Sequence, residues 1–370
     1  MMQSIYEKYN LKKVINASGK MTILGVSRVP EVVLTAQKFG GEHFFEMSEL
    51  LIQTGKYMAD LIGVEGTIVV SSASAGIAQS VAALIGKGSV YHAYHPFTSR
   101  IKQREIILPK GHNVDYGTSV ELMVELGSGQ VKEAGYANMC SPKHIEMMIT
   151  EETAAILYIK SHHTVQKSML TIEEAAEVAH RHQLPLIVDA AAEEDLKKYL
   201  SAGADLVIYS GAKALEGPSS SLVVGKAQFI EWIRLQGKGI GRAMKIGKEN
   251  ILGLTSAVEL FLKEGSESSQ KMKTRLTPFI AALNTVDCLT ASIEQDAAGR
   301  EIYRAKVVIE STSPLTAKEV IVELKKGDLA IYTREYRANN GIIEFDIRAV
   351  NQIEMDKIVQ RLKEILFQKK

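Results

Sequence analysis

A regular alternation between apolar runs and helix-like segments dominates the middle of the chain and limits the folds that it can adopt. The strand-like runs are Thr67–Val70, Glu105–Leu108, Ala154–Ile159, Leu184–Asp189, Ala204–Tyr209 and Ser221–Gly225. Between two of these runs, Thr171–His180 has a helical pattern that begins with a capping box, because Glu174 follows Thr171 by three residues. Near-continuous apolar strands separated by helices are typical of a parallel sheet with helices on both faces. The pattern predicts a large, doubly wound, mainly parallel α/β domain, which we assign to residues 45–264.

The pattern changes beyond a polar stretch that starts at Gly265. The helical patterns of the C-terminal part are Lys271–Leu283, Thr316–Lys325 and Gln352–Leu366, and its strand-like runs are Tyr303–Glu310, Ala330–Thr333 and Gly341–Ile347. This arrangement predicts a small α+β domain at residues 265–370. Residues 1–44 fit neither pattern, and we expect this N-terminal segment to pack on both domains.

Composition excludes several classes of protein. Lys and Arg total 44 and Asp and Glu total 43, so the net charge of +1 gives no reason to expect a nucleic-acid or membrane-surface partner. The two cysteines, Cys140 and Cys288, cannot form a disulfide framework, and no Cys/His cluster predicts a bound metal. The N-terminus lacks the apolar core of a signal peptide, and no apolar run approaches the roughly 18 residues of a membrane span. We therefore expect a cytoplasmic globular protein.

Two polar residues follow neighbouring predicted strands. Asp189 ends the run Leu184–Asp189, and ligands of open α/β sheets bind at the carboxyl ends of the strands. A lone Asp at this position is also a common N-cap of the next helix. Lys213 follows the run Ala204–Tyr209 and lies among small residues in Ser210–Pro218. A loop lysine is often simply solvated, but small neighbours leave room for a large group beside this ammonium.

A third segment adds a possible phosphate site. The small residues Ser71–Gly76 lead into a helical pattern, where the N–H groups of Ser74, Ala75 and Gly76 could hold a phosphate. Pyridoxal phosphate chemistry uses a helix start for the phosphate, an acid for the ring nitrogen and a lysine for the Schiff base. Ser210, three residues before Lys213, is placed to hydrogen-bond the same phosphate. Together these residues predict a pyridoxal 5'-phosphate site with Lys213 and Asp189 at its centre.

Four segments also resemble a known family. Ile15–Gly19, Ser210–Pro218 and Val223–Lys226 are similar to the selenocysteine synthase-like branch of the fold-type I pyridoxal phosphate enzymes, and Gly241–Lys248 resembles the basic segment of that branch. The resemblance runs through most of the chain. It implies a large sheet domain with a smaller C-terminal domain, Lys213 bound to the cofactor, Asp189 at the pyridine nitrogen, and a homodimer or higher homo-oligomer with shared active sites.

The chain departs from selenocysteine synthase itself in two respects. The Ile15–Gly19 motif lies almost at the N-terminus, without the preceding domain that holds tRNA, and the charge is balanced where a tRNA partner favours a basic surface. In length and detail the chain is most similar to the ammonia-lyases of this branch that act on phosphorylated amino sugar acids. This similarity implies an α,β-elimination that releases ammonia. The alternatives are another lyase, aldolase or transferase of the family, or a tRNA-linked seryl or selenium transferase.

The elimination needs a base, an acid and a stacking group. Lys213, once released from the cofactor, is the natural base for the Cα proton. His163 or His162, which follow Ala154–Ile159, are candidates to protonate the leaving hydroxyl, although loop histidines are often only solvated. His112 is a candidate to stack on the cofactor ring.

The anionic substrate needs cationic partners. The resemblance to fold-type I enzymes implies that Arg348, in Phe345–Arg348, binds the substrate carboxylate, and its planar fork suits bidentate binding. Arg242 and Lys245 are spaced so that they can share a helical face, and they are candidates for the substrate phosphate or, from a neighbouring subunit, the cofactor phosphate. Arg28 is a further candidate in the N-terminal segment. Each of these cations can alternatively be an ordinary surface residue.

Overall fold

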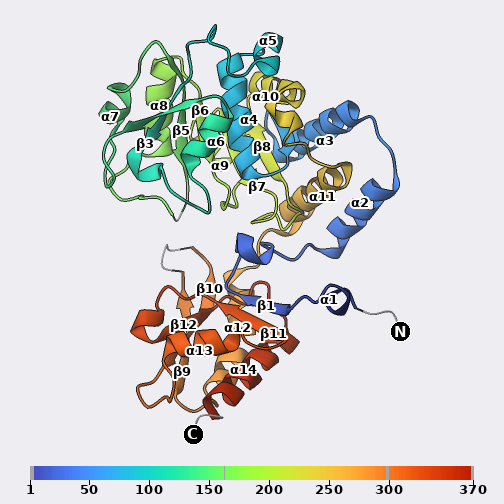
Figure 1. The fold of residues 1–370 in the computed structure, drawn as a ribbon, viewed down its shortest axis with the longest axis vertical. Coiled ribbons are helices and arrows are strands. Elements are labelled where there is room, and N and C mark those ends of the chain that lie inside the picture. The colour runs from blue at the N-terminus through green and yellow to red at the C-terminus, as the bar shows by residue number, and fades with distance from the viewer. Residues whose placement is uncertain (1–3, 162, 297–299, 368–370) are drawn as a thin grey trace. The chain divides into compact units, whose positions relative to one another are not determined.

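The computed structural model describes residues 4–161, 163–296 and 300–367. It divides into a larger unit, Val29–Gly265, and a smaller unit that joins Met1–Arg28 to Ser266–Lys370 (Figure 1). The division near residue 265 differs from the predicted one by a single residue, but the predicted segment 1–44 is split between the units. The reason is that β1 (Lys13–Ala17) pairs in parallel with β11 (Leu329–Thr333), whereas α2 (Glu31–Glu42) packs against α11 (Lys248–Glu264).

A seven-stranded sheet forms the centre of the larger unit. In spatial order its strands are β2 (Gly66–Val70), β8 (Ser221–Gly225), β7 (Leu206–Ser210), β6 (Leu186–Asp189), β5 (Thr153–Ile159), β3 (Glu105–Pro109) and β4 (Gln130–Ala134). The strands β7, β6, β5, β3 and β4 run parallel, and β8 runs antiparallel to both of its neighbours. The mainly parallel sheet is therefore confirmed. The sequence did not predict β4, because its residues are mostly polar.

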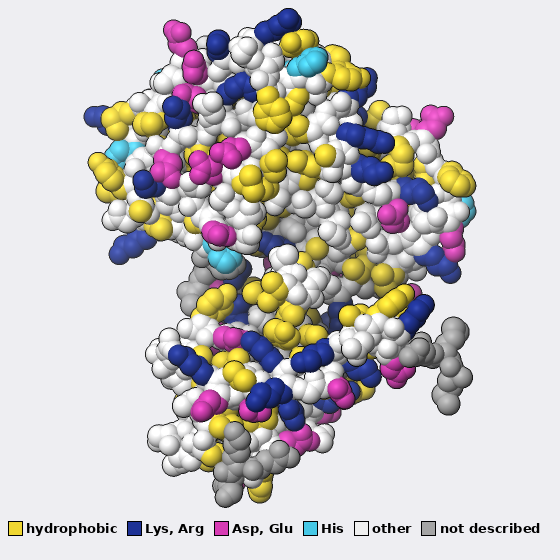
Figure 2. Space-filling view, viewed as in Figure 1, with side chains coloured by type: hydrophobic (Ala, Val, Ile, Leu, Met, Phe, Trp, Pro, Cys, Tyr) yellow, Lys and Arg dark blue, Asp and Glu magenta, His cyan; other side chains and the backbone are white. Residues whose placement is uncertain are grey.

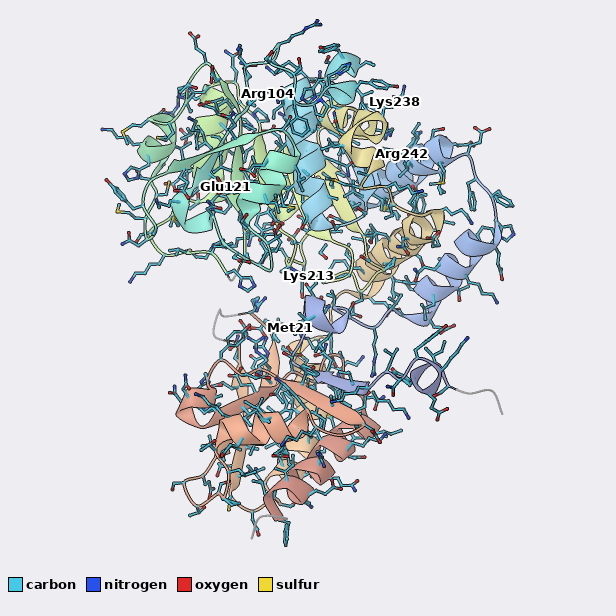
Figure 3. The ribbon with its side chains drawn as sticks, viewed as in Figure 1. Met21, Arg104, Glu121, Lys213, Lys238 and Arg242 are labelled. Atoms are coloured by element: carbon cyan, nitrogen blue, oxygen red, sulfur yellow. The ribbon has the colours of Figure 1, made fainter. Side chains whose placement is uncertain are left out.

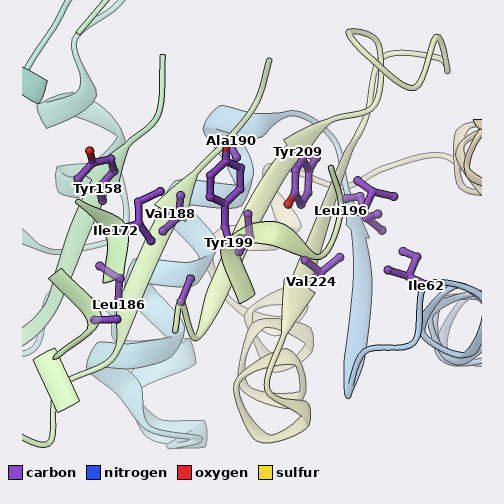
Figure 4. Close-up of a cluster of buried hydrophobic side chains, with 14 of the residues drawn as sticks. Ile62, Tyr158, Ile172, Leu186, Val188, Ala190, Leu196, Tyr199, Tyr209 and Val224 are labelled. Atoms are coloured by element: carbon purple, nitrogen blue, oxygen red, sulfur yellow. The ribbon is translucent and has the colours of Figure 1, made fainter. Parts of the chain in front are cut away.

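Successive residues of the strands enter two apolar layers on opposite faces of the sheet. On β3, Ile106 and Leu108 belong to one layer and Ile107 to the other. The first layer is closed by α4 (Ala73–Gly86), α6 (Val120–Leu126) and α10 (Ala227–Leu235), and the second by α3 (Met47–Ile62), α8 (Ile172–Arg181) and α11. Figure 4 shows part of the second layer, where Tyr158, Tyr199 and Tyr209 pack with aliphatic side chains. The doubly wound arrangement leaves the strand ends, rather than the faces, available for ligands.

The remaining elements of the larger unit are short. They are α5 (Val90–Tyr94), α7 (Pro142–Glu146), α9 (Lys198–Ser201), and the 3₁₀ turns η2 (Lys110–His112), η3 (Gln236–Lys238) and η4 (Ile240–Arg242). The predicted capping box of α8 is present, since Thr171 and Glu174 each bond the other's backbone N–H. Within the described residues, no helix combines the length and apolar character that a membrane crossing requires.

The smaller unit has the predicted α+β character. Its antiparallel sheet has the order β12 (Ile342–Phe345), β10 (Tyr303–Ile309), β9 (Leu289–Gln295). The helices are α1 (Ile5–Lys8), α12 (Ser269–Leu283), α13 (Ala317–Leu324) and α14 (Gln352–Phe367), with the 3₁₀ turns η1 (Thr22–Leu24) and η5 (Ala338–Asn340). One apolar cluster, which includes Phe279, Val307 and Phe345, joins the sheet to α12, α13 and α14. Each large side chain buried there contributes about 1.5–3 kcal/mol to folding.

Candidate active site

The carboxyl ends of β5, β6 and β7 lie side by side, with Asp189 at the end of the middle strand. Asp189 pairs with Ile159 on one side and Ile208 on the other. Its side chain is buried, and Oδ1 accepts the backbone N–H of Ala191 at 3.0 Å. The next helix, α9, begins only at Lys198, so the alternative that Asp189 caps a helix is wrong. Asp189 instead closes a short turn at the ligand-binding edge of the sheet.

The electrostatic surroundings of Asp189 are unfavourable for a carboxylate. Burial raises the pKa of Asp189 to about 6, while the N–H of Ala191 and the charge of Lys213 act in the opposite direction. A buried carboxylate is stabilised when a cation lies beside it. The edge of the sheet therefore holds an acid whose charge the chain compensates only in part.

Lys213, which Figure 3 labels, lies on the loop between β7 and β8, and hydrogen bonds fold this loop back on itself. The N–H of Gly211 donates to Ser220 O at 2.8 Å, and the N–H of Gly217 donates to Gly211 O at 2.8 Å. A side chain at Gly211 would collide with the Ser220 hydroxyl. The backbone N–H of Lys213 donates to Ser210 O at 3.3 Å, and both residues are half-buried. The small residues thus allow a compact loop that fixes the start of the lysine side chain.

The start of α4 is only partly as predicted. Ser72 is the N-cap: its hydroxyl accepts from the N–H of Ala75 at 3.0 Å, and its carbonyl accepts from that of Gly76 at 2.9 Å. These two N–H groups, proposed for a phosphate, are therefore engaged within the helix start. The N–H groups of the first helical residues, Ala73 and Ser74, have no partner within an α-helix. Gly76 has a packing role instead, because a Cβ there would lie 2.9 Å from Ile208 Cγ2 on β7.

Tyr116 is a site residue that the sequence did not reveal. Its hydroxyl lies 3.3 Å from the hydroxyl of Ser74. Burial raises the pKa of Tyr116, and the charge of Asp189 adds to this while the hydrogen bond with Ser74 opposes it. Tyr116 is therefore a protonated donor at neutral pH. The only signal in the sequence is an aromatic residue in the polar turn Asp115–Gly117, shortly after a buried strand.

The histidines differ in their surroundings. His112 is fully buried: Nδ1 accepts the N–H of Ile159 at 3.4 Å, and the ring meets Tyr158 edge-on at 4.5 Å. Burial lowers the pKa of His112 to about 4, so the ring is neutral at pH 7. Its stacking on a cofactor stays a prediction. His163 is exposed on the loop after β5, and its role as proton donor also stays a prediction. His162 lies outside the described residues.

Arg242 and Lys245 do not share a helical face, so that prediction is wrong. The 3₁₀ turn η4 ends at Arg242, and Lys245 lies in the non-helical link to α11. Gly241 explains the tight turn, since a Cβ there would lie 2.7 Å from both Gln236 O and Gln79 Oε1. Both cations are exposed, and Figure 3 places Arg242 well apart from Lys213 within the unit. A role toward a neighbouring subunit stays a prediction.

In the smaller unit the two candidate arginines are both held by carboxylates. Arg28 donates two hydrogen bonds to Glu354 of α14, one of them at 3.1 Å. Arg348 lies just beyond β12, with Nε 2.9 Å from Asp346 Oδ1 and Nη2 2.8 Å from Asp346 Oδ2. The Asp346 contact fixes the plane of the Arg348 guanidinium. Substrate binding by either arginine stays a prediction.

Comparison with known proteins identifies the family. The model of the family described as SelA, L-seryl-tRNA selenium transferase, matches residues 96–285. A D-glucosaminate-6-phosphate ammonia lyase of Salmonella typhimurium is 43% identical over 366 residues, which cover 99% of this chain and 98% of the relative. The chain belongs to the SelA family. This confirms the resemblance predicted from Ile15–Gly19 and Ser210–Pro218.

A second relative and two solved structures are also similar to this chain. A 5'-C-glycyluridine monooxygenase-decarboxylase of Streptomyces sp is 32% identical over 98% of this chain and 92% of its own length. A solved structure of a D-glucosaminate-6-phosphate ammonia-lyase has a TM-score of 0.94 at 43% identity and covers all of both chains. A NifS-like protein shares the fold at a TM-score of 0.56 and 15% identity, covering 97% of this chain and 100% of its own. The fold is therefore that of the fold-type I pyridoxal phosphate enzymes.

Proposed function

We propose that the chain is a pyridoxal phosphate-dependent ammonia-lyase that converts D-glucosaminate 6-phosphate to 2-keto-3-deoxygluconate 6-phosphate and ammonia. The observation that carries this proposal is the 43% identity to a lyase of this name over nearly the whole of both chains. The TM-score of 0.94 to a solved structure of that enzyme supports it.

The residues at the carboxyl edge of the sheet fit the cofactor. When bound, pyridoxal phosphate supplies a ring that accepts the electrons released at the substrate Cα. Asp189 is a buried acid whose charge the described residues compensate only in part, and a protonated ring nitrogen would complete this compensation. Lys213, whose charge already acts on Asp189, supplies the amine for covalent attachment. Ser74, Tyr116 and Ser210 are the proposed ligands of the cofactor phosphate.

The chain's own residues then move the protons of the elimination. The amine of Lys213 takes the Cα proton of the substrate, and Asp189 keeps the ring nitrogen protonated. The C3 hydroxyl is a poor leaving group, so it departs as water with a proton from Lys213 or His163. The released enamine becomes an imine, which water hydrolyses to the keto acid and ammonia. Loss of one water and uptake of another leave ammonia as the net leaving group.

Further residues are proposed to bind the anionic ends of the substrate. Arg348 is assigned the carboxylate, because its guanidinium is already oriented by Asp346. Arg242 and Lys245 remain candidates for a phosphate across a subunit interface. A homo-oligomer is proposed from the family resemblance, and exposed aromatic side chains such as Phe44 (98%) and Phe97 (73%) could enter its interface. We expect a cytoplasmic enzyme.

A tRNA-linked transferase is the second candidate, since the family model carries that description. Basic side chains of the smaller unit are paired with acids, for example Arg334 with Glu344 and Arg337 with Glu294. On the face drawn in Figure 2, cationic and anionic side chains are interspersed. This distribution favours a small-molecule substrate, because tRNA binding relies on clustered positive charge.

Incubation of the purified, cofactor-loaded chain with D-glucosaminate 6-phosphate tests the proposal. The expected products are ammonia and a 2-keto-3-deoxy acid in equal amounts. A chain that binds the cofactor but forms neither product contradicts the substrate assignment. Tight binding of seryl-tRNA in a gel-shift experiment, together with no lyase activity, would favour the second candidate.

A further inference from the structure

The Asn16–Gly19 turn packs directly against the pair Asp346–Arg348. Asn16 Nδ2 donates to Gly19 O at 2.8 Å and its Oδ1 accepts the N–H of Ser18 at 3.0 Å, which closes the turn. Gly19 has a φ of +97°, and a Cβ there would lie 3.1 Å from Asp346 Oδ2 and 3.7 Å from Arg348 Nη2. The backbone N–H of Asp346 donates to Ala17 O at 2.8 Å. Two segments far apart in the sequence thus build one cluster around Asp346.

A second arginine shares the Asp346 carboxylate. Asp346 is fully buried, and its Oδ2 accepts from Arg304 Nε at 3.1 Å as well as from Arg348 Nη2. Burial alone would raise the pKa of Asp346, but the bonds and charges of Arg348 and Arg304 lower it to about 2. The carboxylate is therefore ionised throughout the neutral range.

Arg304 is almost as deeply buried, with 5% of its side chain exposed. Its Nη1 donates to Asp296 Oδ2 at 2.8 Å, and Asp296 also pairs with Arg300 at 3.0 Å. Arg304 Nη2 is buried with no hydrogen-bond partner among the described residues. These pairs join three guanidinium groups to two carboxylates, so positive charge is in excess within the pairs themselves.

The excess charge matters for Arg348, whose side chain is 18% exposed. With Asp346 as its sole neighbour, the charge of Arg348 would be largely cancelled and its attraction for an anion weak. A second cation on the same carboxylate prevents this cancellation. The bidentate contact through Nε and Nη2 also holds the guanidinium in one plane, which sets the orientation in which it can meet a planar carboxylate.

We propose that Asp346 and Arg304 are positioning residues for substrate: Asp346 fixes the guanidinium plane of Arg348, and Arg304 keeps Asp346 from neutralising it. Arg348 then recognises the substrate carboxylate. This inference rests on the proposed function, because it takes a sugar-acid carboxylate as the ligand of Arg348. Gly19 belongs to the same cluster, because the absence of a side chain there lets the Asn16–Gly19 turn pack against Asp346 and Arg348.

Two probes separate carboxylate recognition from the rest of binding. D-Gluconate 6-phosphate carries the carboxylate, and D-glucitol 6-phosphate does not. Calorimetric titration of the cofactor-loaded enzyme with each probe gives two dissociation constants. We expect Asp346→Asn to weaken binding of D-gluconate 6-phosphate by about tenfold or more and to change that of D-glucitol 6-phosphate by less than about twofold. Arg304→Gln is expected to give the same selective loss, and Arg304→Lys to restore part of it.

Three further variants complete the test. In an Arg348→Ala background, Asp346→Asn should cause no additional loss, because it acts through Arg348. Glu344 lies on β12 and pairs with Arg334 and Arg337. Glu344→Gln breaks these two pairs, is the matched control and should change the binding of neither probe. If Asp346→Asn does not fold, Gly19→Ala forces a shift of the same pair and should give the same selective loss.

The inference is overturned if Asp346→Asn weakens the binding of both probes equally or leaves the preference for D-gluconate 6-phosphate unchanged. It is also overturned if Asp346→Asn weakens binding further in the Arg348→Ala background. The proposed function fails separately, when the wild-type enzyme releases no ammonia from D-glucosaminate 6-phosphate. In that case the two probes still decide whether the cluster serves Arg348.

Discussion

Two buried aspartates, one in each unit of the molecule, have opposite electrostatic surroundings. Asp346 in the smaller unit accepts hydrogen bonds from Arg304 and Arg348, and its pKa is lowered to about 2. Asp189 in the larger unit accepts one backbone N–H at 3.0 Å, and burial raises its pKa to about 6. Burial of a carboxylate is unfavourable unless a cation compensates it. The chain supplies the cations of Asp346, and we infer that the cofactor supplies the cation of Asp189.

The most severe test of this contrast removes the lysine beside Asp189. Lys213→Ala should abolish turnover, because no amine remains to attach the cofactor or to take the Cα proton. Borohydride reduction and peptide mass mapping should give a pyridoxyl adduct on Lys213 in the wild type. Lys143→Ala, on the exposed side of α7, is the control and should retain both activity and adduct. An adduct on another lysine would contradict the assignment of Lys213 and of the cofactor site built around it.

The second prediction exchanges the acid itself. Asp189→Asn should lower kcat by about a thousandfold, since the ring nitrogen loses the group that keeps it protonated. The same change should leave the cofactor-free protein as stable at pH 7 or stabilise it by up to about 3 kcal/mol, because it removes an unfavourably buried charge. Steady-state kinetics and urea unfolding measure the two effects. A large loss of stability in Asp189→Asn would mean that Asp189 already has a cationic partner in the cofactor-free protein.

The third prediction concerns the other aspartate. Asp346→Asn should destabilise the protein by about 3 kcal/mol, because the buried Arg304 and the partly buried Arg348 lose their shared anion. Urea unfolding measures this effect, with Glu344→Gln as a control that breaks only partly exposed pairs. A variant as stable as the wild type would show that the Asp346 pairs contribute nothing net, and the contrast with Asp189 would fail.

The two aspartates also predict opposite pH dependence. The pKa of Asp189 is above its ordinary value of 3.8, so the folded state binds more protons and the free energy of unfolding falls as pH rises from about 4 to 6. The pKa of Asp346 is below that value, so its contribution is lost as pH falls from about 4 to 2. Each effect amounts to about 2–3 kcal/mol. Urea unfolding of the cofactor-free protein measures the free energy of unfolding across this range. Its fall between about pH 4 and 6 should disappear in Asp189→Asn. The same fall in the variant and in the wild type would contradict the raised pKa of Asp189.

The smallest predicted effect concerns Tyr116. Tyr116→Phe removes one donor near Ser74 and should weaken cofactor binding by about tenfold, with little change in the stability of the cofactor-free protein. Absorbance titration of the cofactor measures the dissociation constant. Tyr136→Phe, in an exposed tyrosine of the same unit, is the control. Equal affinity in both variants would remove Tyr116 from the site.

The sequence predicts those parts of the site that depend on local patterns. Asp189 and Lys213 each follow an apolar strand, and the parallel sheet brings such strand ends together. The sequence does not predict Tyr116, because its contact with Ser74 joins a loop to the start of α4, two segments that no sequence pattern relates. Arg304 lies on β10 at a position where the strand pattern predicts a solvated side chain. It is nevertheless buried, and it pairs with the carboxylates of Asp296 and Asp346.

The errors have physical causes as well. The spacing of Arg242 and Lys245 fits one helical face, but the 3₁₀ turn η4 ends at Arg242 and Lys245 lies outside any helix. β1 was not predicted, because only its distant partner β11 shows that it is a strand. Long-range contacts therefore account for most of what the sequence did not reveal.

The pKa of Asp189, measured with and without the cofactor, tests the central claim most directly. Carboxyl ¹³C chemical shifts, assigned by the signal that Asp189→Asn removes, give the titration midpoint in each state. The account predicts a midpoint near pH 6 in the cofactor-free protein and one below about pH 4 once pyridoxal phosphate is bound. The same midpoint in both states would contradict it.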